Sequence, residues 1–461
     1  MDLSTNLLHF IAFAVIVVAA YRLSPTKARK YVLLGFNMVF YYICSPKYLI
    51  VMLFAGLWSF FCGKKIEVTG NRKGAALMGI IPLVALLCAF KYWMPVEELL
   101  SGLGGGRIIH LILPIGMSYY ILKSISYLAD IYYKKINPEK DAVAFLAYVT
   151  FFAQIIAGPI QRYKEWHENI NAKPSVGIAS GYYYIVMGLF MKVVIANRLS
   201  TYVTGTFADP SAMGGLQLWL GFFLYAFYIF FDFAGYSNIA IGVTQWFGID
   251  CIKNFKRPYL AVNIKDFWSR WHISLSTWLR DYIYIPLGGN RKGKVRKVIN
   301  VMITFLVSGM WHGSTLNFIV WGGYHGIFST IYGGKIQQTG KFKHFANIIL
   351  TFLVVSCGWV FFATETLGDS VEYFKGMLTR VSFDMTSIQS AILPFTSDNT
   401  CLSFFLVAVA FIVIYILKEL NDEFRVVKTN VATSFLWQVF ILSSIILFGS
   451  FGATSFIYAG F

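Results

Sequence analysis

Two histidines in apolar surroundings are the residues best suited to chemistry in this sequence. His272 lies in a segment dense in tryptophan, and His312 lies between Gly309 and Gly313. No Asp, Glu, Lys or Arg occurs from residue 298 to residue 334, so we expect burial to keep the His312 imidazole neutral and able to accept a proton. The alternative is a hydrogen-bonded histidine that only links two helices.

A neutral imidazole can act as the general base for a hydroxyl that attacks an activated thioester. This reaction needs positioning and proton removal but no protein nucleophile. The sequence has no G-x-S-x-G, P-loop or H-E-x-x-H motif, and its six cysteines include no C-x-x-C pair. We therefore predict acyl transfer from a thioester, with no metal and no bound cofactor.

Two further residues are candidates for supporting the site. Asp232 lies in the apolar stretch 216–246, where a carboxylate needs a partner. The stretch is either one long segment or two segments broken at residues 231–238, and the candidate partners are Tyr236, Asn238 or a basic residue such as Arg280. A structural hydrogen bond at such a joint is the alternative. Trp311, the residue before His312, is the second supporting candidate.

A basic loop lies between the two histidines in the sequence. Residues 291–297 include five basic side chains, among them Arg291, Lys292 and Lys294. Guanidinium and ammonium groups bind phosphate oxygens, so we predict that these three residues contact the phosphates of a coenzyme A thioester at the cytoplasmic face. The alternative is an ordinary basic loop that is retained on the cytoplasmic side.

The sequence around each histidine also predicts local structure. Residues 267–282 have helical periodicity, with tryptophan and leucine on one face, and they place His272 at the seam with a polar face that keeps it solvated. A straight helix over residues 298–334 would be about 55 Å long, too long for one membrane span. We expect the chain to turn back at the glycines that flank His312.

The composition predicts an all-α, polytopic membrane protein. Of the 461 residues, 57% are hydrophobic and 13% charged, whereas soluble domains have about a quarter charged. The sequence contains roughly eleven apolar segments that can form transmembrane or re-entrant helices. The net charge of +17 lies mainly in short loops, which indicates cytoplasmic retention and contact with membrane lipids and argues against nucleic-acid binding. We predict one multi-pass domain over residues 1–461.

Several regions between the apolar segments carry their own predictions. Residues 101–106 are rich in glycine and typical of a flexible connector. Residues 142–157 form either a full span or a re-entrant element. Residues 363–400 are the least apolar region, and we expect an extramembrane loop with one short helix. The basic residues at 22–30 and 64–73 place these loops in the cytoplasm.

Several motifs together resemble the membrane-bound O-acyltransferase (MBOAT) family. The block Phe-Trp-Ser-Arg-Trp-His-Ile-Ser-Leu-Ser at 267–276, with Tyr-Ile-Pro-Leu-Gly-Gly-Asn at 284–290, is long enough to be specific. Other matching stretches extend over nearly the whole chain: 113–120, 126–130, 157–160, 188–195, 231–238, 254–255, 309–313, 357–362 and 456–458. The sequence is most similar to the bacterial branch that O-acetylates polysaccharides, typified by alginate.

This resemblance implies a fold, a site and partners. It implies a helical core at about residues 110–335 with a tunnel through the bacterial inner membrane, and transfer of an acetyl group from cytoplasmic acetyl-CoA to an extracytoplasmic polysaccharide. It implies that His312 is the essential base or acyl-relay residue and that His272 orients the donor or the acceptor. It also implies a separate extracytoplasmic acetyltransferase as partner. D-alanyl transfer to teichoic acid, a transporter and a structural scaffold are the alternatives.

Overall fold

A computed structural model describes residues 6–102, 111–171, 177–334, 340–392, 399–424 and 430–451. Every regular element in these ranges is helical, which confirms the predicted fold class. Residues 103–106 of the predicted glycine-rich connector and the matching stretch 456–458 lie outside the described residues. Ser101 and Gly102 are not part of a loop, because they end the long helix α4 (Arg72–Gly102).

Six helices in the described ranges are long and apolar enough to cross a membrane. They are Pro46–Val68, Arg72–Met94, Ile178–Ala208, Gly215–Trp246, Lys341–Ala363 and Val431–Phe448. Each has at least 18 residues, which at 1.5 Å per residue comes close to the hydrocarbon thickness of a bilayer. This number fits a multi-pass membrane protein. It is smaller than the eleven predicted segments because several of those segments form shorter helices.

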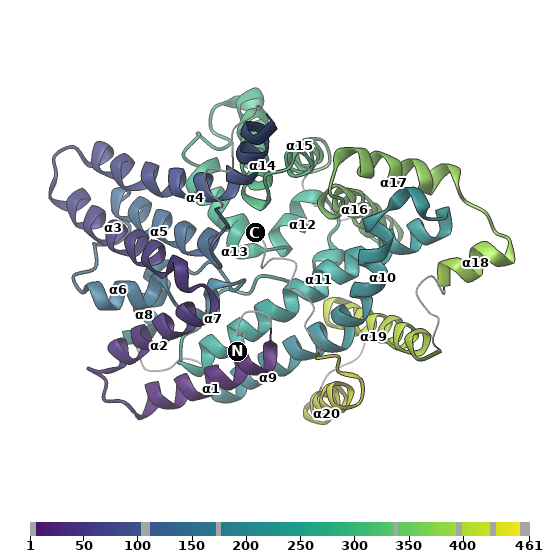
Figure 1. Ribbon diagram of the computed structural model, residues 1–461, viewed down its shortest axis with the longest axis horizontal. Helices are drawn as coiled ribbons and strands as arrows, with labels where there is room; N and C mark the ends of the chain where they lie inside the picture. The colour runs from purple at the N-terminus through teal and green to yellow at the C-terminus, as the bar shows by residue number, and fades with distance from the viewer. Residues whose placement is uncertain are drawn as a thin grey trace. The chain divides into compact units, whose positions relative to one another are not determined.

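The chain divides into two compact units, of which the first contains Met1–Ile185, Ser237–Lys253 and Ser455–Phe461. It contains the whole of α4 and the last part of α11 (Gly215–Trp246). Its other helices are α1 (Leu7–Leu23), α2 (Arg29–Cys44), α3 (Leu49–Val68), α5 (Met117–Tyr132), α6 (Ala142–Val149), α7 (Phe152–Ile155), α8 (Tyr163–Asn171) and most of α9 (Ile178–Leu189). Helix α5 is buried from Met117 to Ile131 and packs against α3 and α4 (Figure 1). Of the two alternatives for residues 142–157, the structure excludes a full span, because α6 has 8 residues and α7 has 4.

The second unit contains Val186–Tyr236 and Asn254–Thr454. Its helices are α10 (Asn197–Ala208), most of α11 (Gly215–Trp246), α12 (Ile264–Arg270), α13 (Ile273–Leu279), α14 (Gly293–His312), α15 (Leu316–Ile331), α16 (Lys341–Ala363), α17 (Leu367–Thr379), α18 (Met385–Ile392), α19 (Asn399–Phe424) and α20 (Val431–Phe448). Two π-helical segments, Phe190–Ala196 and Arg280–Tyr284, also belong to this unit. The single domain over 1–461 and its core at 110–335 stay predictions.

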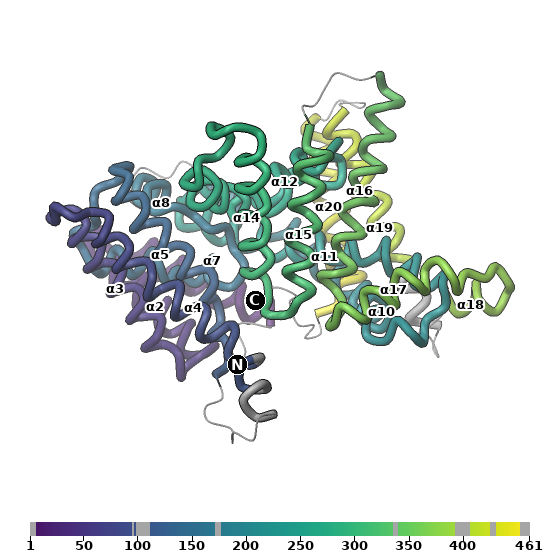
Figure 2. The backbone as a smooth tube through the Cα atoms, turned by 90° about the horizontal axis from the view of Figure 1, so that it is seen from above, coloured from purple at the N-terminus to yellow at the C-terminus, as the bar shows by residue number. Residues whose placement is uncertain are grey.

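Helices α14 and α15 form a close antiparallel pair (Figure 2). Glycines permit the contact: a Cβ atom on Gly309 would lie 2.1 Å from the Phe318 carbonyl oxygen, and one on Gly322 would lie 2.4 Å from that of Phe305. The chain turns directly after His312, so the predicted turn within residues 298–334 is confirmed.

The predicted continuous helix over residues 267–282 is wrong. Helix α12 ends at Arg270, Trp271 is extended, and His272 has a left-handed backbone with φ 43° and ψ 53° before α13 begins. A left-handed conformation cannot continue a right-handed helix, because each helical residue needs negative φ. The tryptophan face that periodicity placed on one helix is therefore divided between two.

The structure settles two other expectations. Helix α11 runs unbroken from Gly215 to Trp246, so of the two alternatives for residues 216–246 the single long segment is correct and there is no break near Asp232. In the described residues 363–392, two helices, α17 and α18, follow α16 where one short helix was expected for 363–400. A capping box formed by Thr366 and Asp369 starts α17, a signal that was present in the sequence.

Candidate active site

The structure brings His272, Trp311 and His312 together within the second unit. The centroid of the Trp311 ring lies 6.3 Å from that of His272 and 4.9 Å from that of His312. Both imidazoles are buried, with 1% and 3% of their surface exposed. The three predicted residues thus form one cluster, in which the indole contacts both imidazoles.

His272 is enclosed by aromatic side chains, so its predicted solvated position is wrong. The Phe233 ring of α11 packs edge-on against it at 4.7 Å between centroids. Burial lowers the pKa of His272 to about 3, which keeps its imidazole neutral near pH 7. A left-handed backbone at a residue other than glycine is uncommon, and such conformations concentrate at functional sites.

His312 occupies the last position of α14, where the helix meets its turn. Its ring packs against Trp321 at 5.0 Å and Phe362 at 5.3 Å between centroids. Gly313 follows, and a Cβ atom there would lie 2.0 Å from the Phe318 ring, so the turn requires glycine. The structure therefore fixes an imidazole among aromatic walls, an arrangement that suits a general base with a single orientation.

A cavity of about 730 Å³ lies in the second unit. Ile273, which follows His272, and Ser308 line it, whereas His272, Trp311 and His312 are not among its lining residues. Its walls come from α12, α13, α14, α15 and the loop after the π-helical turn Arg280–Tyr284. They include the apolar side chains of Trp268, Leu275 and Phe305 and reach Ser308. Ser308 lies one helical turn before His312 on α14, so the two share one face of that helix.

Four basic residues contribute to the cavity wall: Lys265, Arg280, Arg291 and Lys297. Of the three predicted donor-binding residues, Arg291 lines the cavity, whereas Lys292 and Lys294 are not among its lining residues. Arg280 donates a hydrogen bond to Asp281 at 2.8 Å, so its charge is partly neutralised. Lys265, Arg291 and Lys297 are therefore the basic groups best able to meet an anionic ligand.

Asp232 forms a buried ion pair with Lys192. The expectation of a basic partner is therefore confirmed, but the residue is Lys192 and not Arg280, the example given for it. Lys192 belongs to the π-helical segment Phe190–Ala196, which widens the helix where it faces α11. A Cβ atom on Gly235 would lie 2.9 Å from the Gly188 carbonyl oxygen, so the two backbones touch at this point. Each of these charges is isolated in apolar sequence, and that shared feature could have identified the pair.

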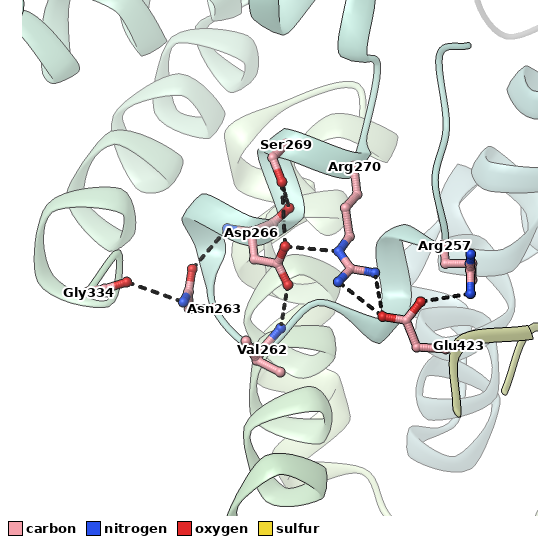
Figure 3. A network of polar contacts seen from close by, with 8 residues as sticks. All are labelled: Arg257, Val262, Asn263, Asp266, Ser269, Arg270, Gly334 and Glu423. Carbon is pink, nitrogen blue, oxygen red and sulfur yellow. Dashed lines mark hydrogen bonds and ion pairs between the residues drawn. The ribbon is translucent and has the colours of Figure 1, made fainter. Parts of the chain in front are cut away.

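An ion network secures α12 just before the break at His272. Figure 3 shows Arg270 between Asp266 and Glu423: its Nε donates to Asp266 at 2.9 Å, and both terminal nitrogens donate to Glu423 at 3.3 Å. Arg257 pairs with the other oxygen of Glu423 at 2.8 Å. Because Glu423 lies on α19, the network ties α12 to that helix. Arg270 is thus held by carboxylates and does not keep His272 hydrated.

The remaining predicted supporting residue, Asn238, lies on α11 beyond Asp232, in the stretch that belongs to the first unit. Its supporting role stays a prediction. Within the described ranges, no group of three or more His, Cys, Asp or Glu side chains is arranged to hold a metal ion. Sequence reasoning named Asn254 only as part of the matching stretch 254–255 and gave it no role at the site, although its carbonyl oxygen accepts a hydrogen bond from the Ile273 N–H, directly after His272.

An all-helical protein with several apolar spans and a buried histidine pair beside a basic-rimmed cavity has the features of a membrane acyltransferase. The family model of the membrane-bound O-acyltransferases matches residues 134–363. Together with relatives that match most of the chain, this shows that the chain belongs to the membrane-bound O-acyltransferase family and is an O-acyltransferase.

Three relatives show where the chain falls within that family. It is 35% identical to a probable alginate O-acetylase AlgI of Pseudomonas putida, over 85% of this chain and 83% of the relative. It is 32% identical to a peptidoglycan O-acetyltransferase of Helicobacter pylori, over 78% and 76%. A teichoic acid D-alanyltransferase of Bacillus subtilis is 30% identical over 54% and 68%. The resemblance to the alginate-type branch is confirmed.

Proposed function

We propose that the chain moves an acetyl group from acetyl-CoA, at the cytoplasmic face of a bacterial inner membrane, to O-acetylate an extracytoplasmic polysaccharide. Support for this cargo comes from relatives named for alginate and peptidoglycan O-acetylation, which match most of the chain. The D-alanyltransferase matches only about half of it, so D-alanyl transfer to teichoic acid is the second candidate. Membership in an acyltransferase family favours both over a transporter or a scaffold.

The observation that carries the proposal is the cavity beside α14. Arg291 and Lys297 line it near the first turn of that helix, and its wall continues to Ser308. From Lys297 to His312 the helix rises about 22 Å at 1.5 Å per residue. A coenzyme A thioester matches this arrangement, because it has phosphates at one end and the thioester at the tip of a long arm. We assign its phosphates to the basic residues and its thioester to the end nearest His312.

In the proposed reaction, the acceptor hydroxyl oxygen attacks the thioester carbonyl carbon while the imidazole of His312 takes the hydroxyl proton. The carbon–sulfur bond breaks, the ester forms, and the proton passes from the imidazole to the departing thiolate. His272 is held beside Trp311 and orients the donor or the acceptor. Burial of the cluster excludes water that would hydrolyse the thioester.

We further propose that a separate extracytoplasmic acetyltransferase completes transfer to the polymer. In that case, the tunnel implied by the resemblance delivers the acetyl group to the partner, and the hydroxyl that attacks the thioester beside His312 belongs to the partner or to the polymer. Six helices in the described part of the chain are long and apolar enough to cross a membrane, which suits a protein that moves the acetyl group through the bilayer and leaves the final transfer to a partner.

A gene-deletion strain tests the function. The strain is complemented with wild type, with His312→Ala, or with Lys294→Ala as a surface control, and ester-linked acetate and D-alanine are measured on exported polymers after mild alkaline release. We expect wild type and the control to restore acetate and His312→Ala to restore none at equal membrane expression. Restoration of D-alanine instead would select the second candidate. Acetate restored by His312→Ala would contradict the mechanism.

A further inference from the structure

Helix α13 begins without a cap of its own. The side chain of its first flanking residue, His272, makes no capping hydrogen bond. The first N–H groups of a helix have no acceptor within that helix, and leaving them unpaired in a dry interior is costly. Asn254 supplies two acceptors: its carbonyl oxygen accepts from Ile273 N–H at 2.9 Å, and its side-chain oxygen accepts from Ser274 N–H at 3.3 Å.

The same segment also holds the end of α12. The Lys256 N–H donates to the Arg270 carbonyl oxygen at 2.9 Å. Between these two attachments, the Phe255 ring packs edge-on against both Phe233 and Trp271 at 5.0 Å between centroids. Residues 254–256 therefore contact the chain on both sides of the break.

This arrangement changes what His272 does at the start of α13. A residue in that position usually has an extended backbone and caps the helix with its own side chain. His272 is left-handed, and Asn254 does the capping in its place. The imidazole can then lie between Phe233 and Trp311. The orientation of the ring thus depends on a residue that is remote in sequence and itself 1% exposed.

We propose that Asn254 is a positioning residue of the active site: it holds His272 in its left-handed conformation and so fixes the imidazole against Trp311, beside His312. This proposal rests on the proposed function, in which His272 orients the donor or the acceptor. A displacement of about 1 Å in an active site can cost up to 10²-fold in rate. Loss of the Asn254 side chain should therefore lower turnover even when the protein folds.

The chain offers a matched control in Asn263. This asparagine is also buried, and its side chain caps the neighbouring helix α12 by accepting from the Asp266 N–H at 2.9 Å. In the described part of the chain, its side chain bonds to Gly334 and Asp266 and not to the backbone of residues 271–274, and it does not line the cavity. Asn263→Ala therefore removes a cap of the same kind without acting on His272.

The experiment is a double-mutant cycle on the full-length protein. Asn254→Ala, His272→Ala, the double variant and Asn263→Ala are expressed in the deletion strain, and the initial rate of ester-acetate incorporation is divided by the amount of folded protein from size-exclusion chromatography. If Asn254→Ala fails to accumulate, Asn254→Ser takes its place, because the shorter hydroxyl cannot reach Ser274 but keeps the site polar.

We expect Asn254→Ala to lower the rate about 10-fold or more, Asn263→Ala to lower it less than about twofold, and the double variant to match His272→Ala within about twofold, because a residue that acts through another adds nothing once that residue is gone. Equal fold losses in both backgrounds, a fully active Asn254→Ala, or a fully active His272→Ala would each overturn the proposal. Activity of His312→Ala would instead refute the proposed function, so the two failures are distinguishable.

Discussion

Removal of one basic side chain should weaken the affinity for coenzyme A only if that side chain lines the cavity, although each such removal lowers the net charge equally. Arg291 and Lys297 line the cavity, whereas Lys294 lies between them in sequence and does not. All three are exposed, so solvent screens them and each contact with a phosphate contributes about 1 kcal/mol rather than the larger value of a buried pair. Since 1.4 kcal/mol is tenfold in affinity, Arg291→Ala and Lys297→Ala should each raise the Kd of coenzyme A about fivefold.

The assay is calorimetric titration of coenzyme A into the detergent-solubilised protein at low and high salt. The double variant Arg291→Ala/Lys297→Ala should raise the Kd about 25-fold, because the free energies of separate contacts add. Lys294→Ala should change it less than about twofold, and salt should weaken the wild type most. Equal losses for Lys294→Ala and Arg291→Ala would show a general attraction of anions by a chain of net charge +17 and would refute the assignment of the cavity.

Four further predictions concern the buried groups and the topology. His312→Ala should lower the acetylation rate about 10² to 10⁴-fold with normal expression, and His272→Ala should cost less, as the complemented strain will measure. Asp232→Asn should destabilise the protein by about 3 kcal/mol, because it leaves Lys192 buried without its partner, and adding Lys192→Gln should recover part of the melting temperature. Stability should fall as the pH drops from about 6.5 towards 3, because His272 binds a proton in the unfolded protein, whereas burial keeps its imidazole unprotonated in the folded protein. The variant His272→Gln should flatten this pH dependence. A cysteine at position 294 should resist labelling from outside whole cells, and efficient labelling would contradict the cytoplasmic placement of the loop.

The turn after His312 was predictable because the residues that cause it are its neighbours in the sequence. A run too long for one span, with no charge and with glycines on both sides of the histidine, leaves few alternatives to a tight helical pair. The backbones of α14 and α15 can touch at Gly309 and Gly322 because glycine has no side chain. The catalytic candidate could therefore be placed at a helix end from its neighbours alone.

The break at His272 could not be predicted in the same way. Residues 267–282 satisfy helical periodicity, because tryptophan and leucine that pack against a core recur at similar spacing on two short helices. The causes of the break are remote: hydrogen bonds from residues 254–256. The pair formed by Lys192 and Asp232 is likewise set by the meeting of two helices. Both misses concern tertiary contacts that override a local pattern.

The two histidines differ in a way that their helix ends explain. His312 lies at the carboxyl end of α14, where the unpaired carbonyl groups carry partial negative charge, and His272 lies at the amino end of α13, where the N–H groups carry partial positive charge. A helix terminus stabilises a charge of opposite sign by about 0.3 to 2 kcal/mol. The imidazolium formed when a base accepts a proton is therefore favoured at His312 and disfavoured at His272. This asymmetry supports the proposed role of His312 in proton transfer and the proposed role of His272 as a neutral hydrogen-bonding group. A carboxylate engineered beside α13 should therefore not turn His272 into a base, and recovery of activity by such a carboxylate in a His312→Ala background would refute this division.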